Sequence, residues 1–239
     1  MKKNIQMIIL CGGKGRRMGR LTQKIPKPLI KVGKKSILEH KIDYYKSQKI
    51  QNFIFCLGYK YRLIEKFLQK KKVKSEIVNS GINAGILKRI YSTKKFLKNN
   101  VLISYGDTLA QINFNSLVRS HENSKRLMTL VAAPIQNPFG LLSWNKKKLV
   151  TDFNEKPILN HFIGYAVLNP NIFKILSKNI INMPDGKGMI EAIKFLIKKK
   201  QVNIYTFEDL QVTINSPEEL QNAKLNYKKY FTLNEKFKK

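Results

Sequence analysis

Apolar and polar positions alternate in a regular way through the first half of the chain. Short apolar runs, typical of strands buried in a parallel sheet, are separated by longer segments whose apolar residues recur at helical spacing. In the first of these longer segments, Leu38, Ile42 and Tyr45 share one helical face. The pattern predicts strands over residues 6–10, 52–57, 75–78 and 101–105, and helices over residues 36–48, 61–69 and 86–97.

The second half contains strand and helix signals in a less regular order. Ser216 followed by Pro217 is a typical helix start, because serine caps the first turn and proline suits the first helical position. The pattern predicts strands over 127–134, 162–168 and 203–207, a hairpin of 141–144 with 149–153, and helices over 171–176, 188–199 and 216–229. Together the two halves predict an α/β fold, a doubly wound and mostly parallel sheet with a small β/α lobe in the second half.

One domain is the expected organisation. The chain has 239 residues, of which 43% are hydrophobic, so it can bury a substantial core. No repeat, low-complexity block or linker divides it. We expect a single domain over residues 1–230, made of an N-terminal half (1–126) and a C-terminal half (127–230), and a basic tail over 231–239.

A net charge of +31 raises the possibility of nucleic-acid binding. The excess is almost all lysine and is spread along the chain with abundant Ile and Asn, which is typical of an AT-rich genome. The lysine clusters at 70–72, 146–148 and 198–200 each suit a loop or a helix end. We therefore expect the charge to attract anionic substrates, and the pattern does not indicate nucleic acid as a partner.

Cysteine content and hydropathy indicate in which compartment the protein is located and whether it crosses a membrane. Cys11 and Cys56 lie on apolar, strand-like segments and predict small buried side chains, with neither a disulfide framework nor zinc spacing. No apolar run approaches the roughly 18–20 residues that span a bilayer. We expect a cytoplasmic protein without a membrane segment.

A glycine-rich turn follows the first predicted strand. Gly12, Gly13 and Gly15 lack Cβ atoms, so backbone N–H groups there can approach an anionic ligand closely. Arg16 and Arg17 add guanidinium groups that match phosphate oxygens. Glycines alone fit an ordinary turn equally well, whereas the combination with arginines favours phosphate binding.

Lys27 lies between Pro26 and Pro28, whose fixed φ angles stiffen the segment that presents its ammonium group. Asp107 follows the strand over 101–105 and Gly106. Since ligands of such folds bind beyond the carboxyl ends of the strands, Asp107 is placed opposite the glycine turn, where a carboxylate suits Mg²⁺. By itself, an aspartate in this position fits a helix cap or a loop equally well.

Two further segments carry candidate binding residues. In Glu155-Lys156-Pro157, a lysine held by the following proline suits a second phosphate group, or else a surface turn. The loop over 79–89 has two glycines before a helix, and its backbone and Asn83 can read the edge of a flat base, or it is a plain strand-to-helix loop.

The three histidines, His40, His121 and His161, are scattered and have no companion nucleophile. We therefore interpret them as structural or surface residues. Catalysis is expected to depend on positioning and charge neutralisation, as is usual for transfer between phosphates.

The segment CGGKGRRMGRLTQKIPKPL (residues 11–29) resembles the signature of the sugar-1-phosphate nucleotidyltransferases. The resemblance continues through 55–60 (FCLGYK), 85–89 (GILKR), 104–108 (SYGDT), 139–140, 155–157 and 216–220 (SPEEL), and so covers nearly the whole chain. It implies a Rossmann-like fold and an enzyme that converts an NTP and a sugar 1-phosphate into an NDP-sugar and pyrophosphate. The N-terminal half is then the NTP-binding half and the C-terminal half the sugar-phosphate-binding half.

The resemblance also implies roles for individual residues. Arg17 and Lys27 match the catalytic residues that bind the phosphates, and Asp107 matches a Mg²⁺ ligand. The expected sugar-phosphate-binding residues are Gly140, Glu155, Lys156 and Gly164. The expected nucleotide-binding residues are Leu10, Gly12, Gly13, Gly15, Arg16, Asn83, Gly85 and Gly106.

Two positions depart from the family pattern. Arg16 stands where a threonine is usual. Thr213 occupies the place of the aspartate that is commonly the second Mg²⁺ ligand, and Asp209, four residues earlier, is the alternative. The second ligand is therefore Asp209 or Thr213, or activity is reduced or altered.

Several functions stay open on the sequence. The chain resembles glucose-1-phosphate cytidylyltransferases slightly more than other members, which favours CTP over guanylyl or thymidylyl transfer to a mannose-, heptose- or glucose-type phosphate, or cytidylyl transfer to a phosphonate. A nucleotide-sugar-binding protein that has lost turnover is the alternative suggested by Thr213. Multimers are frequent in the family, so the resemblance also allows a homo-oligomer.

Overall fold

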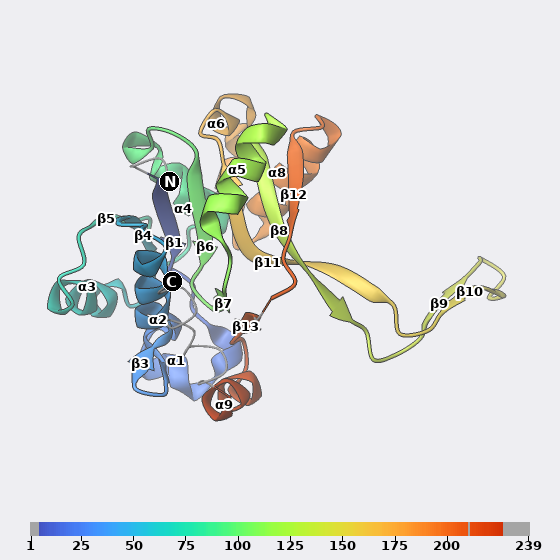
Figure 1. Cartoon of the computed structure of the whole chain (residues 1–239), viewed down its shortest axis with the longest axis horizontal. Coiled ribbons are helices and arrows are strands. Elements are labelled where there is room, and N and C mark those ends of the chain that lie inside the picture. Colours follow the sequence, from blue (N-terminus) through green and yellow to red (C-terminus); the bar gives the residue numbers. More distant parts are fainter. Residues whose placement is uncertain (1–4, 210, 227–239) are drawn as a thin grey trace.

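A seven-stranded sheet forms the centre of the molecule (Figure 1). The computed structural model describes residues 5–209 and 211–226. β11 runs antiparallel to both of its neighbours, and the other neighbouring strands pair in parallel. Across the sheet the order is β12 (Val202–Thr206), β8 (Met128–Gln136), β11 (Ile158–Leu168), β6 (Val101–Tyr105), β1 (Gln6–Leu10), β4 (Asn52–Leu57) and β5 (Ser75–Asn79). The predicted Rossmann-like α/β fold is therefore confirmed.

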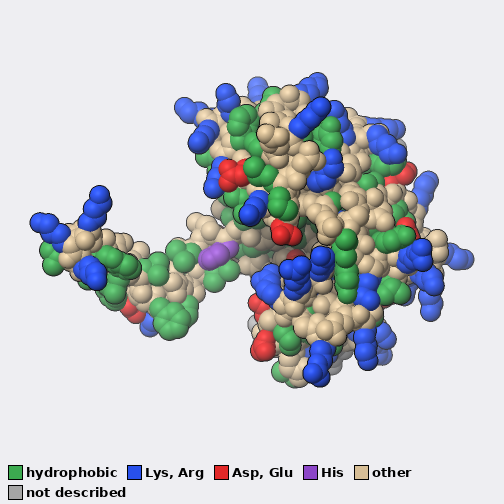
Figure 2. Space-filling model, turned by 180° about the vertical axis from the view of Figure 1, so that it is seen from behind, with side chains coloured by type: hydrophobic (Ala, Val, Ile, Leu, Met, Phe, Trp, Pro, Cys, Tyr) green, Lys and Arg blue, Asp and Glu red, His purple; other side chains and the backbone are tan. Residues whose placement is uncertain are grey.

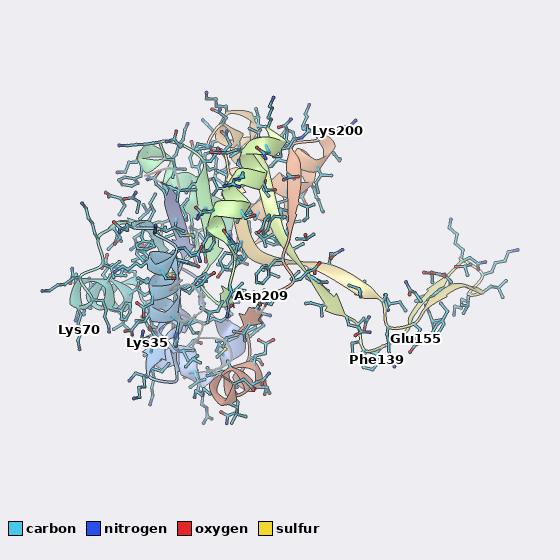
Figure 3. The ribbon with its side chains drawn as sticks, viewed as in Figure 1. Lys35, Lys70, Phe139, Glu155, Lys200 and Asp209 are labelled. Atoms are coloured by element: carbon cyan, nitrogen blue, oxygen red, sulfur yellow. The ribbon has the colours of Figure 1, made fainter. Side chains whose placement is uncertain are left out.

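Alternating residues of the strands supply two separate cores. In β1, Met7 and Ile9 pack against one layer of helices, and Ile8 packs against the other. On the first face lie α2 (Ile37–Ser47), α3 (Tyr61–Lys70) and α5 (Phe114–Ser124); on the second lie α4 (Ile86–Ser92), α6 (Ile172–Ile175), α7 (Lys178–Asn182) and α8 (Lys187–Lys198). The lysine clusters at 70–72 and 198–200 lie at the ends of α3 and α8, as Lys70 and Lys200 show in Figure 3.

A smaller apolar cluster joins the C-terminal helix to the glycine-rich segment. Met18, Ile30 and Ile37 from the N-terminal part pack with Ile214 and Leu220. The elements that contribute are α2, β2 (Lys31–Val32), β7 (Thr108–Ala110), β13 (Gln211–Thr213) and α9 (Pro217–Leu225). β3 (Lys35–Ser36) pairs with β2, and α1 (Arg20–Lys24) follows Met18 in the chain. Sequence analysis did not predict the β7–β13 pair, because strands of three residues are too short to show periodicity.

The predicted helix at 216 is confirmed. The Ser216 hydroxyl accepts a hydrogen bond from the Glu219 backbone N–H, and the Glu219 carboxylate accepts one from the Ser216 backbone N–H, which completes a capping box. Its predicted end at 229 and the tail over 231–239 lie outside the described residues.

An arm projects from the body of the molecule (Figure 1). The outer parts of β8 and β11 lead out to a two-stranded sheet of β9 (Leu141–Trp144) and β10 (Val150–Asn154), the hairpin predicted from sequence. Apolar side chains line the arm and basic ones stand at its tip (Figure 2). The most exposed large apolar residues of the arm are Phe139, Leu142, Trp144, Leu149, Val150, Phe153 and Ile158.

Two histidines, His121 buried and His40 half-buried, make folding stability depend on pH. Burial lowers the pKa of His40 and of His121 from the ordinary value of 6.5, and His121 is bonded to the Thr129 hydroxyl at 2.8 Å. Below pH 6.5 the histidines of the unfolded chain are protonated while those of the folded chain stay neutral to a lower pH. The free energy of unfolding therefore decreases as the pH falls. We expect a lower free energy of unfolding at pH 5 than at pH 7.5 in urea titrations. His121→Gln should shrink this difference, and an unchanged difference would contradict the assignment.

Candidate active site

The glycine-rich turn and Asp107 meet at one cavity beyond the carboxyl ends of β1 and β6. Its volume is about 800 Å³, within the usual range for a small-molecule site. A second hollow of about 260 Å³ adjoins it and is lined by Lys27, Pro28 and Asn215 together with the glycine turn. The residues of the larger cavity that sequence analysis had selected are Leu10, Gly12, Gly13, Gly15, Arg16, Arg17, Asn83, Gly106 and Asp107. Gly85 caps α4 beside Asn83 and is not in the lining of either cavity.

Close packing explains why glycine stands at several positions around the cavity. A Cβ on Gly106 would lie 2.5 Å from the Leu10 carbonyl oxygen, where the turn after β6 crosses the end of β1. Gly15 has a φ of 63°, a left-handed conformation that glycine adopts without strain. A Cβ on Gly13 would meet nothing within 4 Å, so its backbone faces open space in the cavity.

Arg89 is a buried cation behind the glycine turn, and sequence analysis did not select it. It is 4% exposed, and its guanidinium occupies the space that Cβ atoms on Gly12 and Gly58 would need. It donates to the Leu57 carbonyl oxygen at 2.5 Å, and burial lowers its pKa from the ordinary value. The available sequence signal was a charged residue on the apolar face of a predicted helix, between Leu87 and Ile90.

Lys27 links the two sides of the smaller hollow. Its ammonium lies 2.8 Å from Asp107 Oδ2 and 2.9 Å from Asn215 Oδ1, and the lysine is 8% exposed. Arg17 donates to the same Asn215 oxygen at 3.0 Å. One carboxylate and one amide oxygen therefore hold a cation between them, next to the glycine turn.

Asn215 is a second residue that sequence analysis missed. It comes directly before the Ser216 cap, and its backbone N–H donates to the Glu219 carboxylate. The Ile214 N–H donates to the Asp107 carbonyl oxygen at 3.0 Å, so the β13 end is tied to the β6–β7 turn. These contacts place the Asn215 side chain opposite Lys27.

The two alternatives for a second metal ligand lie in different places. The Thr213 hydroxyl lies 3.2 Å from that of Thr108, the residue after Asp107, although Thr213 is not in the lining of either cavity. Asp209 is exposed and is not in the lining of either cavity (Figure 3). Among the described residues, no three His, Cys, Asp or Glu side chains gather as a metal cluster. The side-chain oxygen that accepts from the Lys27 ammonium together with Asp107 belongs to Asn215.

The expected sugar-phosphate residues are divided between the body and the arm. Gly164 in β11 has a φ of 78° and packs against Tyr105, which lines the larger cavity. Gly140, Glu155 and Lys156 lie on the arm, where Figure 3 labels Glu155, and none of them lines a cavity of the body. The structure thus brings the three arm residues together, away from Lys27 and Asp107.

Burial makes both thiols unreactive. The Cys11 side chain borders the smaller hollow but is only 1% exposed, and burial raises the pKa of its thiol to about 12. Burial also raises the pKa of the Cys56 thiol well above its usual range. Because only thiolates react readily, we expect no labelling of either residue by iodoacetamide at pH 8 in the native protein, and labelling of both in denaturant. Mass spectrometry reads the result, and native labelling of Cys11 would contradict the burial.

Comparison with known proteins decides the family. Residues 6–212 match the family model described as nucleotidyl transferase. The chain belongs to that family. It is an enzyme of the nucleotidyltransferase type, as the resemblance in its sequence implied. No helix in the described part of the chain is long and apolar enough to cross a membrane.

Two curated relatives cover most of the nucleotidyltransferase. It is 30% identical to a probable glucose-1-phosphate cytidylyltransferase from Bacillus subtilis, over 84% of this chain and 87% of the relative. It is 28% identical to D-glycero-alpha-D-manno-heptose 1-phosphate guanylyltransferase from Campylobacter jejuni, over 93% of this chain and 100% of the relative.

Solved structures share the fold. A putative glucose-1-phosphate thymidylyltransferase from Bacillus anthracis superposes with a TM-score of 0.74 at 18% identity, over 93% of this chain and 94% of that one. HddC from Yersinia pseudotuberculosis, complexed with GMP-PN, gives a TM-score of 0.72 at 18% identity, over 94% and 100%.

Proposed function

We propose that this nucleotidyltransferase joins CTP to a sugar 1-phosphate and releases pyrophosphate. A phosphate oxygen of the sugar 1-phosphate attacks the α-phosphorus of the nucleotide in line, and the bond to the β-phosphate oxygen breaks. The observation that carries the proposal is that the Lys27 ammonium lies between the oxygens of Asp107 and Asn215, beside an open glycine turn. This arrangement combines phosphate-binding groups with hard oxygen ligands in one place.

The lining of the cavities suggests a role for each group. Backbone N–H groups of the glycine turn, with Arg16 and Arg17, bind the β- and γ-phosphates, and Lys27 neutralises charge at the α-phosphate. Asn83, on the far side of the larger cavity, lies where it can contact the base. Leu10, Gly12 and Gly106 shape the wall through close backbone packing.

A divalent cation, Mg²⁺, fits the donor set. Asp107 and Asn215 already direct oxygens at one ammonium, and Mg²⁺ is commonly bound by one or two carboxylates plus substrate phosphates. When bound, Mg²⁺ would offset negative charge on the phosphates as the pyrophosphate leaves. In the protein alone, Lys27 compensates the Asp107 carboxylate.

The choice of CTP is supported by the cytidylyltransferase relative and by the resemblance of residues 58–60, 105–107 and 139–140 to that group. Guanylyl transfer to a heptose-type phosphate is the second candidate, favoured by the guanylyltransferase relative, of which the chain covers the whole length.

Pyrophosphate release tests the function directly. The full chain is incubated with each NTP in turn, Mg²⁺ and a panel of hexose and heptose 1-phosphates. We expect release with CTP and at least one sugar 1-phosphate. Faster release with GTP would replace CTP by the second candidate, and NTP binding without release from any pair would overturn the enzyme in favour of a binding protein.

The arm of a second copy supplies the sugar-phosphate side of the site in this proposal. Lys156 and Glu155 lie on an arm that leads away from the cavity of their own chain. A two-stranded hairpin is marginally stable alone, and the arm exposes large apolar residues such as Phe139, Trp144 and Ile158. Docking on a second copy buries these residues and adds Lys156 to a cavity that lacks it. We therefore expect a homo-oligomer.

Mixed variants test this arrangement. Lys27→Ala and Lys156→Ala are each expected to be inactive, whereas the heterodimer formed on their co-expression should recover about half of wild-type turnover in a two-fold dimer, because one of its two sites is intact. Recovery is measured as pyrophosphate release after co-purification with two affinity tags. A monomer in solution, or no recovery in the mixture, would show that the arm acts on its own chain.

A further inference from the structure

Lys41 is a fully buried lysine in the first helical layer. It lies in α2 on the face that carries Leu38, Ile42 and Tyr45, and its exposed fraction is 0%. Lysine is almost never buried to this degree unless it is paired. None of the ion pairs found in the described part of the chain involves Lys41.

The partners of Lys41 are a backbone carbonyl and two tyrosines. Its ammonium donates to the Thr108 carbonyl oxygen and, at 2.9 Å, to the Tyr165 hydroxyl. It also lies 4.8 Å from the ring centroid of Tyr165 and 5.6 Å from that of Tyr45. The Tyr165 hydroxyl donates to the same Thr108 carbonyl at 2.8 Å. Two donors from different elements therefore converge on one carbonyl oxygen.

Stability does not account for a lysine in this place. Removing an ammonium from water costs several kcal/mol, and an apolar side chain of the same shape is often neutral or stabilising in such a position. Thr108 would keep a hydrogen bond from Tyr165 without Lys41. The Lys41 ammonium is explained better by the backbone that it holds in place than by a contribution to the free energy of unfolding.

The residue before Thr108 is Asp107. The two successive peptides on either side of Thr108 are both held, since the Asp107 carbonyl accepts a hydrogen bond from the Ile214 N–H at 3.0 Å and the Thr108 carbonyl accepts one from Lys41. We propose that Lys41 is a positioning residue for nucleotidyl transfer, whose buried ammonium keeps the Asp107 carboxylate turned toward Lys27 and the cavity. This inference rests on the proposed role of Asp107 in the active site.

Lys41→Met tests the inference, because the methionine side chain is nearly as long as that of lysine and carries no charge. We expect an unfolding midpoint that is unchanged or raised, and a kcat lowered about 10- to 100-fold with the KM for the nucleotide unchanged. Amide hydrogen exchange at Ile214 should become faster, since its acceptor on Asp107 is less firmly held. This last measurement needs no activity, so it still tests the inference if the proposed reaction fails.

Two tyrosine variants serve as controls. Tyr45→Phe removes a hydroxyl bonded to Ser104 at 2.5 Å and to the Tyr165 hydroxyl at 3.3 Å. It keeps the ring beside Lys41 and both donors to the Thr108 carbonyl, and should therefore leave kcat unchanged. Tyr165→Phe removes the second donor to Thr108 without a charge change, and should lower kcat and speed the exchange at Ile214. It also keeps the inference testable if Lys41→Met does not fold. Unchanged kcat and exchange in both the Lys41 and Tyr165 variants, or losses that follow a fall in global stability, would overturn it.

Discussion

Replacing Asp107 with asparagine is expected to lower kcat by about 10²- to 10³-fold, the usual effect of losing one electrostatic partner in a transfer site. The substitution keeps the shape of the side chain and removes its charge. The Asp107 carboxylate compensates Lys27 at 2.8 Å and is the only carboxylate that borders the smaller hollow within the described part of the chain. Initial rates of pyrophosphate release at saturating substrates measure the effect.

Asp209→Asn is the matched control for Asp107→Asn. Asp209 was the other carboxylate considered as a ligand, yet it is exposed and lies outside both cavities. We expect its turnover to stay within about two-fold of wild type, as for most surface substitutions. A large loss with Asp209→Asn, together with a small loss with Asp107→Asn, would reverse the assignment of the metal-binding carboxylate.

Replacing Gly106 with alanine is expected to destabilise the fold by about 3 kcal/mol, at the upper end for an overpacked site. The new Cβ would lie 2.5 Å from the Leu10 carbonyl oxygen. Neither backbone can retreat easily, because β1 and β6 are paired in register from Gln6 with Val101 to Leu10 with Tyr105. Urea unfolding followed by circular dichroism measures the change.

Gly13→Ala separates packing from binding. A Cβ at Gly13 has open space around it, so the free energy of unfolding should stay within about 1 kcal/mol of wild type, close to an ordinary surface change. The added methyl group points into the cavity, where it obstructs the approach of phosphate, so the KM for the nucleotide should rise. A free energy of unfolding for Gly106→Ala that is no lower than that for Gly13→Ala would contradict the close approach of Gly106 to β1.

The sheet and the nucleotide side of the site were predictable from local pattern. Apolar runs gave β1, β4 and β6 at their observed bounds, because strands buried on both faces are continuous apolar segments. Once those strands are parallel, their carboxyl ends meet, so the glycine turn and Asp107 had to converge. No long-range information was needed for that step.

Residues that act from a distance in sequence were not predictable in this way. Asn215 reaches Lys27 across 188 positions, through a β7–β13 pair too short to be recognised. Arg89 and Lys41 lie on helical faces otherwise apolar, where pattern analysis gives no partner for the charge. Each of them donates to a backbone carbonyl, a group which every residue possesses and no sequence motif marks.

By itself, the sequence determined the α/β fold, the glycine-rich turn and Asp107 at the ends of strands, and the family, because these depend on local periodicity and on residue types at short spacing. Only the tertiary structure decided that Asn215 and Asp107 both accept hydrogen bonds from Lys27, that Lys41 is buried beneath the β6–β7 turn, and that Glu155 and Lys156 lie on an arm. These depend on packing between distant segments. The hairpin over β9 and β10 was visible in the sequence, but its direction is set by how far β8 and β11 extend beyond the body.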